Sequence, residues 1–153
     1  MTMTVTKTVQ IGRPATDSYA FIADPETMPQ WAIHNVQGIR PLDDERWEMQ
    51  TPRGKAILMP HYEKHGSILD HAFVDASEGV WNVSARIVPA GPSASVYMIT
   101  LPKPDAMPME AFEAGMALMD EELAALKACI ESLPARTPME NVESDHPGPS
   151  KAL

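Results

Sequence analysis

The sequence predicts a small α+β domain in which a curved antiparallel sheet wraps around one long C-terminal helix. Between residues 36 and 101, apolar and polar side chains alternate in several short stretches, a pattern typical of strands. Turn sequences separate these stretches, so successive strands are expected to pair as antiparallel hairpins. A single apolar stripe at helical spacing follows them, and the sheet is the only large apolar surface that could cover it.

The first strand is expected at residues Thr4–Ile11, where β-branched and polar side chains alternate. Pro14 suits the start of a helix, and residues Ala15–Ala23 carry apolar side chains at helical spacing. Asp24 can cap a second short helix that runs to about Trp31. The later strands are expected at Gly38–Pro41, Arg46–Thr51, Lys55–Tyr62, Ser67–Asp75, Gly79–Val88 and Ser93–Leu101.

The long helix is the strongest pattern in the chain. Its stripe has spacings of four, three, four, three and four residues, and consists of Phe112, Met116, Met119, Leu123, Leu126 and Ile130. Pro134 ends the helix, and the residues after it are polar, rich in proline and without periodicity. The sequence therefore predicts one domain over residues 1–133 and a polar Pro-rich tail over residues 134–153. A many-stranded sheet curls, so a helix in its concave face leaves a pocket beneath it.

Composition and charge exclude several classes of partner. The chain has 153 residues, 44% of them hydrophobic, which is enough for one domain with a core. The formal net charge is −9 and the 12 Lys and Arg residues are scattered, so neither nucleic acid nor an anionic membrane is expected as a partner. Acidic residues gather at 43–45 and at 110–122, and we expect both groups to be solvated faces.

The compartment follows from two further observations. Residues Met1–Gln10 lack the apolar segment of a signal peptide. The single cysteine, Cys129, rules out an internal disulfide and favours a reducing compartment. Both predict a cytoplasmic protein. Monomer and homodimer are equally compatible with the sequence.

Ile11–Pro14 lead into the first predicted helix, and Asp24–Trp31 follow it. This order of elements resembles the START/Bet v 1-like (SRPBCC) superfamily, in its bacterial polyketide cyclase/dehydrase-like branch. Thr51–Gly54 and Gly66–His71 are similar to short bacterial members of that branch. The resemblance covers residues 4–133 and implies the helix-grip fold, with about six or seven strands and two short helices after the first strand. It implies a hydrophobic cavity but no particular reaction, because carriers, aromatase/cyclases and dehydratases of the superfamily share no single catalytic motif.

Three residues are candidates for acid–base catalysis. His34 follows Trp31 by three positions, where the resemblance places the cavity mouth, and the alternative for it is an exposed loop histidine. Asp70 and His71 are adjacent in a strand, so at most one of them faces the pocket. We favour His71, because Leu58 and Tyr62 would then share its face. The alternative for this pair is a hydrogen bond that fixes strand pairing.

Aromatic and methionine side chains are expected to line the pocket, although core packing alone would also account for most of them. Tyr62 or Tyr97 could orient a ligand through its hydroxyl. Gly115 would allow a ligand to approach the long helix closely, and the alternative for it is relief of crowding against the sheet. The ligand-binding residues predicted are Trp31, Tyr62, Trp81, Tyr97, Phe112, Met116 and Met119.

Neither a metal nor a cofactor is expected. His61, His65 and His71 lie in and around strands, and four strand residues span roughly 13 Å, far beyond a zinc ligand shell of about 2 Å. The sequence has no phosphate-binding glycine loop and no nucleophile elbow.

Three functions remain. The first is binding of a hydrophobic small molecule, of lipid, polyketide or aromatic type. The second is a cyclase or dehydratase that uses His34, His71 or Asp70 as acid or base. The third is a protein-interaction module with an exposed groove.

Overall fold

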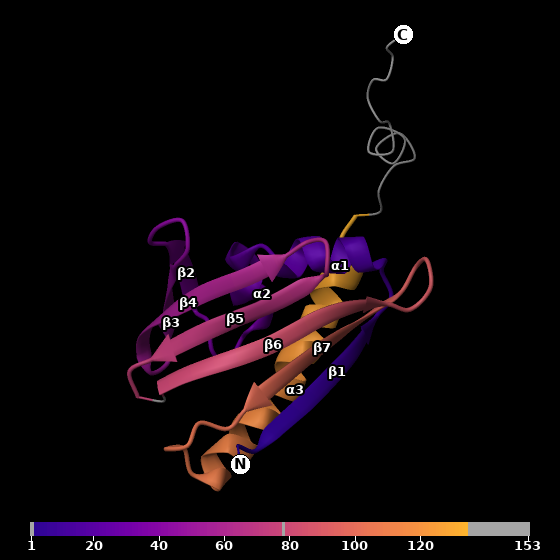
Figure 1. Cartoon of the computed structure of the whole chain (residues 1–153). Coiled ribbons are helices and arrows are strands. Elements are labelled where there is room, and N and C mark those ends of the chain that lie inside the picture. The colour runs from indigo at the N-terminus through magenta and orange to yellow at the C-terminus, as the bar shows by residue number, and fades with distance from the viewer. Residues whose placement is uncertain (1, 78, 135–153) are drawn as a thin grey trace.

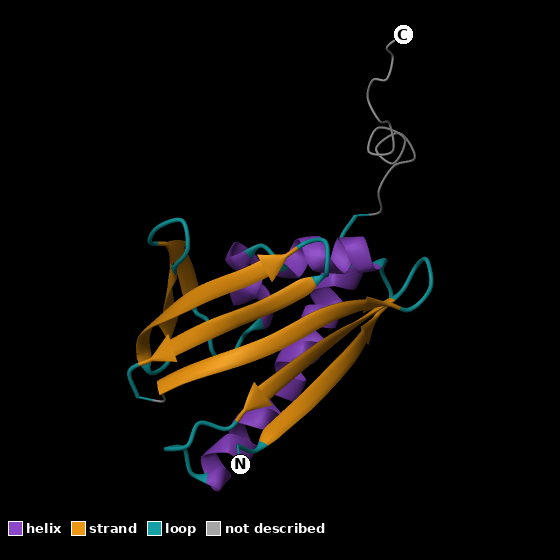
Figure 2. Ribbon diagram, viewed as in Figure 1, coloured by secondary structure: helices purple, strands orange, loops and turns teal. Residues whose placement is uncertain are grey.

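Seven antiparallel strands form one sheet that curves around a long helix, as a computed structural model describes for residues 2–77 and 79–134 (Figures 1 and 2). The strands are β1 (Thr4–Ile11), β2 (Gly38–Pro41), β3 (Trp47–Thr51), β4 (Gly54–Glu63), β5 (Ile68–Asp75), β6 (Gly79–Pro89) and β7 (Ser95–Pro102). Their order is β1-β7-β6-β5-β4-β3-β2, so β2 to β7 form a meander and β1 closes against β7. The predicted α+β helix-grip architecture is confirmed. The tail predicted after Pro134 lies outside the described residues.

The helical segments are α1 (Ala15–Ile22), the 3-10 turn η1 (Pro25–Thr27), α2 (Met28–Trp31) and α3 (Met109–Glu131). The second short helix is thus split into η1 and α2. Asp24 caps η1, since its Oδ1 accepts the backbone N–H of Glu26 at 3.0 Å, as its position before Pro25 predicts. α3 ends at Glu131, before Pro134 is reached.

The strand register decides which side chains of β5 face α3. Phe73 lies opposite Leu58, and Leu69 lies opposite Tyr62. Because side chains alternate along a strand, His71 shares the inner face with Leu69 and Phe73. Asp70 therefore points to the outer face of the sheet.

α3 lies against the concave face of the sheet (Figure 2), and its apolar stripe belongs to the hydrophobic core. All of its members are buried except Met119, which is half-buried. The acidic face is different from the prediction at one position: Glu110, Glu113, Asp120 and Glu121 are exposed, but Glu122 is only 1% exposed. Glu122 stands four residues before Leu126 and so lies beside the stripe rather than opposite it.

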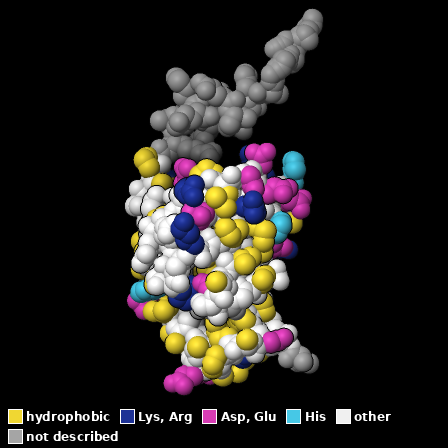
Figure 3. Space-filling model, turned by 90° about the vertical axis from the view of Figure 1, so that its left-hand side faces the viewer, with side chains coloured by type: hydrophobic (Ala, Val, Ile, Leu, Met, Phe, Trp, Pro, Cys, Tyr) yellow, Lys and Arg dark blue, Asp and Glu magenta, His cyan; other side chains and the backbone are white. Residues whose placement is uncertain are grey.

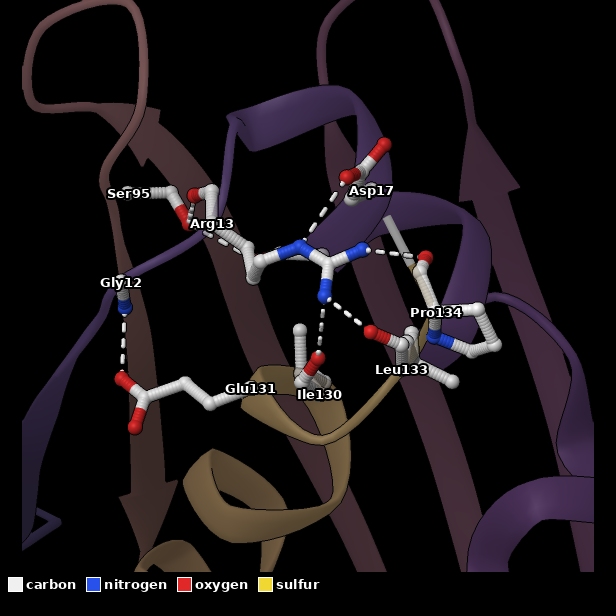
Figure 4. Close-up of polar contacts among 9 residues, drawn as sticks. Gly12, Arg13, Asp17, Ser95, Ile130, Glu131, Leu133 and Pro134 are labelled. Atoms are coloured by element: carbon white, nitrogen blue, oxygen red, sulfur yellow. Dashed lines mark hydrogen bonds and ion pairs between the residues drawn. The ribbon is translucent and has the colours of Figure 1, made fainter. Parts of the chain in front are cut away.

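The C-terminal end of α3 is tied to the start of α1 by Arg13 (Figure 4). The Arg13 guanidinium donates to the main-chain oxygens of Ile130, Leu133 and Pro134 at 3.3, 2.6 and 3.1 Å. Carbonyls in the last turn of a helix have no partner within the helix, and a cation there is stabilising. On the same side, Glu131 accepts the backbone N–H of Gly12 at 2.6 Å. This end of the helix is therefore closed against the β1–α1 connection.

Candidate functional site

A cavity of about 370 Å³ lies between the first half of α3, α2 and the inner face of β5, β6 and β7. Its volume falls in the range of about 300–1,000 Å³ that small-molecule sites occupy. Four polar side chains line it, and the rest of the lining is apolar. The polar residues are Asn35, Arg53, His71 and Glu122; the apolar ones are Met28, Trp31, Ala32, Val36, Phe73, Trp81, Val83, Ile99, Leu101, Met107, Ala111, Phe112, Ala114, Gly115, Met116, Leu118 and Met119.

The space exists because small residues face it from α3. Ala111, Ala114 and Gly115 all line the cavity, and a Cβ added to Gly115 would meet no atom within 4 Å. Beside them, Phe112 of the same helix stacks on Trp81 of β6, with ring centroids 6.2 Å apart and 21° between the planes. The helix therefore touches the sheet through Phe112, while the small residues next to it leave the cavity unfilled.

The cavity opens to solvent between the β3–β4 turn and the first half of α3. Its lining residues that are also exposed are Arg53 in the turn, and Ala111, Ala114 and Leu118 on the helix. Hydrophobic side chains reach the molecular surface as well, and Figure 3 shows them running down one face between charged groups. The rim is therefore apolar on the side of α3, where an apolar molecule could enter, and cationic on the side of Arg53.

His71 presents a neutral imidazole to the cavity. The residue is half-buried in the wall of the cavity, and this burial lowers its pKa, against the opposing effects of a hydrogen bond to Leu69 and the charge of Asp70. Nδ1 donates to the main-chain oxygen of Leu69 at 3.1 Å, because a carbonyl can only accept. In the neutral ring, Nε2 is then the acceptor. His71 is thus equipped to take a proton or to accept a hydrogen bond.

Glu122 is a buried carboxyl group at the other side of the cavity. Its Oε2 accepts the backbone N–H of His34 at 2.9 Å, and Asn35 donates to both of its oxygens at 3.2 Å. Burial raises the pKa of Glu122, while the donors from His34 and Asn35 oppose that rise. The loop after α2 and the middle of α3 are joined through this one side chain.

Asn35 also connects Glu122 to the cation of the cavity. The Arg53 guanidinium donates to Asn35 Oδ1 at 3.4 Å and forms an ion pair with Asp75 at 2.9 Å. Asp75 is buried and accepts the backbone N–H and the hydroxyl of Ser77 as well. A continuous polar path therefore runs from Glu122 through Asn35 and Arg53 to the end of β5.

Comparison with known proteins identifies the fold. No protein-family model matches the sequence, and no curated protein does. A START superfamily protein from Mycobacterium smegmatis matches with a TM-score of 0.67 and 19% identity, over 86% of this chain and 99% of that one. Norcoclaurine synthase from Thalictrum flavum matches with a TM-score of 0.67 and 10% identity, over 88% of this chain and 96% of that one. The Zhui aromatase/cyclase from Streptomyces sp. R1128 matches with a TM-score of 0.65 and 12% identity, over 86% of this chain and 92% of that one.

The chain has the START/Bet v 1-like fold. This confirms the resemblance at the level of fold. At such identities the likeness says nothing about activity.

Within this START/Bet v 1-like fold, five of the seven residues predicted to bind a ligand line the cavity. They are Trp31, Trp81, Phe112, Met116 and Met119. The other two, Tyr62 and Tyr97, lie in the core outside the lining, and burial raises the pKa of both phenols. Both face inward, as the register requires, but from positions nearer the other end of α3, where the core is filled.

Of the three predicted acid–base residues, only His71 lines the cavity. Asp70 is on the outer face, ion-paired to Arg86 and accepting the Ala85 N–H at 2.9 Å, so it serves strand pairing. His34 places its backbone N–H on Glu122, but its ring lies 3.3 Å from Glu121 at the exposed surface. Neither Asp70 nor the His34 ring is therefore in reach of a molecule in the cavity.

Sequence reasoning missed Glu122, Asn35 and Arg53. The sequence did contain a signal for Glu122. Gly115, Met119, Glu122 and Leu126 follow one another at spacings of four, three and four residues, so they lie on one face of the helix, next to the apolar stripe. Arg53 lies in a tight turn, and a turn sequence does not indicate whether such a side chain folds back over a cavity.

In the described ranges, no three His, Cys, Asp or Glu residues are grouped closely enough to hold a metal ion. None of the helices described there is long and apolar enough to cross a membrane.

Proposed function

We propose that this protein binds a hydrophobic small molecule in the cavity between α3 and the sheet. The observation that carries the proposal is the cavity itself: about 370 Å³, mostly apolar, and open beside the first half of α3. A void of this size lined by large side chains loses dispersion contacts that a ligand would restore. A norcoclaurine synthase and an aromatase/cyclase share this fold, so the fold is compatible with binding alone or with binding and turnover.

An apolar fluorescent probe tests the proposal. Gly115→Phe should fill the cavity, because nothing lies within 4 Å of the added Cβ, and should abolish probe binding while the protein stays folded. Ala117→Phe is the matched control: it puts the same side chain on the same helix, at an exposed position outside the cavity. Equal binding by both variants would show that the probe does not occupy this cavity.

A second candidate is a cyclase or dehydratase that acts on a polyketide-like or aromatic molecule held in the same cavity. The observation that favours it is the neutral His71 imidazole in the lining, whose Nε2 is free of protons and can act as a general base. With a turned-over substrate in hand, His71→Gln should stop turnover and leave its binding intact. If turnover persists in that variant, His71 is not the base.

The interaction-module alternative needs a collapsed interior and an apolar groove on the surface. The open cavity argues against a collapsed interior. Failure of every apolar probe to bind would bring this alternative back.

A further inference from the structure

We propose that the cavity selects a hydrophobic amine, whose ammonium group forms an ion pair with the Glu122 carboxylate. This inference rests on the proposed function and specifies the class of ligand. The geometry behind it is a buried carboxylate in the lining of an apolar cavity, at the inner end of the lining residues of α3.

Glu122 has no cationic partner among the residues that the structure describes. Its hydrogen-bond donors are the His34 backbone N–H and the Asn35 amide, which carry no net charge. Burial raises the pKa of Glu122, and these donors together with the charge of His34 oppose that rise and favour the carboxylate. A buried carboxylate without a counter-ion is costly, and removing such a charge from water is compensated only by pairing it. An ammonium group in the cavity would supply the missing charge.

The other charged groups around the cavity do not supply a counter-ion for Glu122. Arg53 is the one cation in the described lining, and Asp75 is ion-paired to it at 2.9 Å and is itself buried. His71 is held neutral by its surroundings. Glu121, next to Glu122, is exposed, acidic and outside the lining, so it supplies no counter-ion. Since Asp75 balances Arg53, the lining keeps a net negative charge, which repels a carboxylate ligand and attracts an amine.

A purely structural role for Glu122 is the competing explanation, because the side chain also holds the loop after α2. The two roles depend on different properties. Holding the loop needs only a hydrogen-bond acceptor, and a glutamine amide oxygen at the position of Oε2 can accept both the His34 N–H and the Asn35 amide. Binding an ammonium group needs the negative charge. Glu122→Gln therefore separates the roles.

The experiment uses three probes of similar shape: 1-naphthylmethylamine, 1-naphthaleneacetic acid and 1-methylnaphthalene. Each competes with the apolar fluorescent probe for the full-length protein at pH 7.5. We expect the amine to bind at least about tenfold more tightly than the acid, and Glu122→Gln to weaken the amine by about tenfold while the neutral hydrocarbon is unaffected. Glu121→Gln, an exposed neighbour, should leave all three affinities unchanged.

Two results would overturn the inference while leaving the proposed function in place. One is equal binding of amine and acid to the wild-type protein. The other is a parallel loss of all three probes in Glu122→Gln, together with a lowered melting temperature, which would assign Glu122 to the structure of the loop. If the neutral hydrocarbon does not bind either, the proposed function itself fails.

Discussion

The two halves of α3 carry the same apolar stripe, yet the second half packs into a filled core and the first half borders a cavity. In the second half, Leu126 and Ile130 are completely buried, and Arg13 and Glu131 fasten the end of the helix to the β1–α1 connection. In the first half, the helix face around Gly115 looks into an open cavity. One helix thus has a filled core beneath its second half and a cavity beside its first half.

This difference indicates that a pocket can form because one end of a helix is anchored, and not only because side chains are small. A rigid helix pinned at one end has a fixed direction, and the curvature of the sheet then decides where the two surfaces separate. Small residues on the helix, Ala111, Ala114 and Gly115, keep the gap open where it begins. Stability is accordingly expected to be concentrated at the C-terminal half of α3, and binding at the N-terminal half.

The largest expected effect is the loss of Leu126. Leu126→Ala should reduce the free energy of unfolding by about 2–5 kcal/mol, since it leaves a void in a filled core. Met119→Ala, on the cavity side and only half-buried, should cost roughly half of that or less. Urea unfolding of the two variants measures the contrast. Equal costs would mean that the two halves of the helix do not differ in packing.

Arg13 is expected to have the next largest effect. Arg13→Ala removes donors from the oxygens of Ile130, Leu133 and Pro134, and should cost about 1–3 kcal/mol of unfolding free energy. Arg40→Ala, which breaks an exposed ion pair with Glu48, is the control and should cost less than about 1 kcal/mol. If both variants unfold at the same urea concentration, Arg13 does not anchor the helix.

The sequence predicted the elements well and the site only in part, for a physical reason. Periodicity reports which face of an element is apolar, so the stripe of α3 and the inner face of β5, including His71, were predictable. Periodicity does not report the distance between two apolar surfaces. Tyr97 and Trp81 therefore looked equivalent, although one fills the core and the other lines the cavity. Glu122 belongs by sequence to the acidic group at 110–122, and periodicity alone does not distinguish it from the exposed members, because it lies directly beside the stripe residue Leu123.

A smaller effect of opposite sign is expected at Gly115. Gly115→Ala should increase the free energy of unfolding by about 0.5–1 kcal/mol, because alanine is the better helix former and its Cβ enters empty space. The same change in a filled part of the helix would clash. Thermal unfolding followed by circular dichroism measures the gain. A decrease in melting temperature would indicate that the cavity at Gly115 is closed in solution.

The smallest expected effect is the pH dependence of the unfolding free energy that His71 contributes. Burial lowers the pKa of His71 below that of the unfolded chain, near 6.5. The unfolded protein then binds the extra proton more readily, so the stability from the neutral ring is present above about pH 6.5 and is lost as the pH falls through the folded pKa. The raised pKa of Glu122 works in the opposite direction, with stability lost as the pH rises, and it is common to wild type and variant. The difference between wild type and His71→Gln in unfolding free energy should therefore shrink from pH 7.5 to pH 5.5. A difference that is constant across this range would place His71 in contact with water rather than in the protected wall of the cavity.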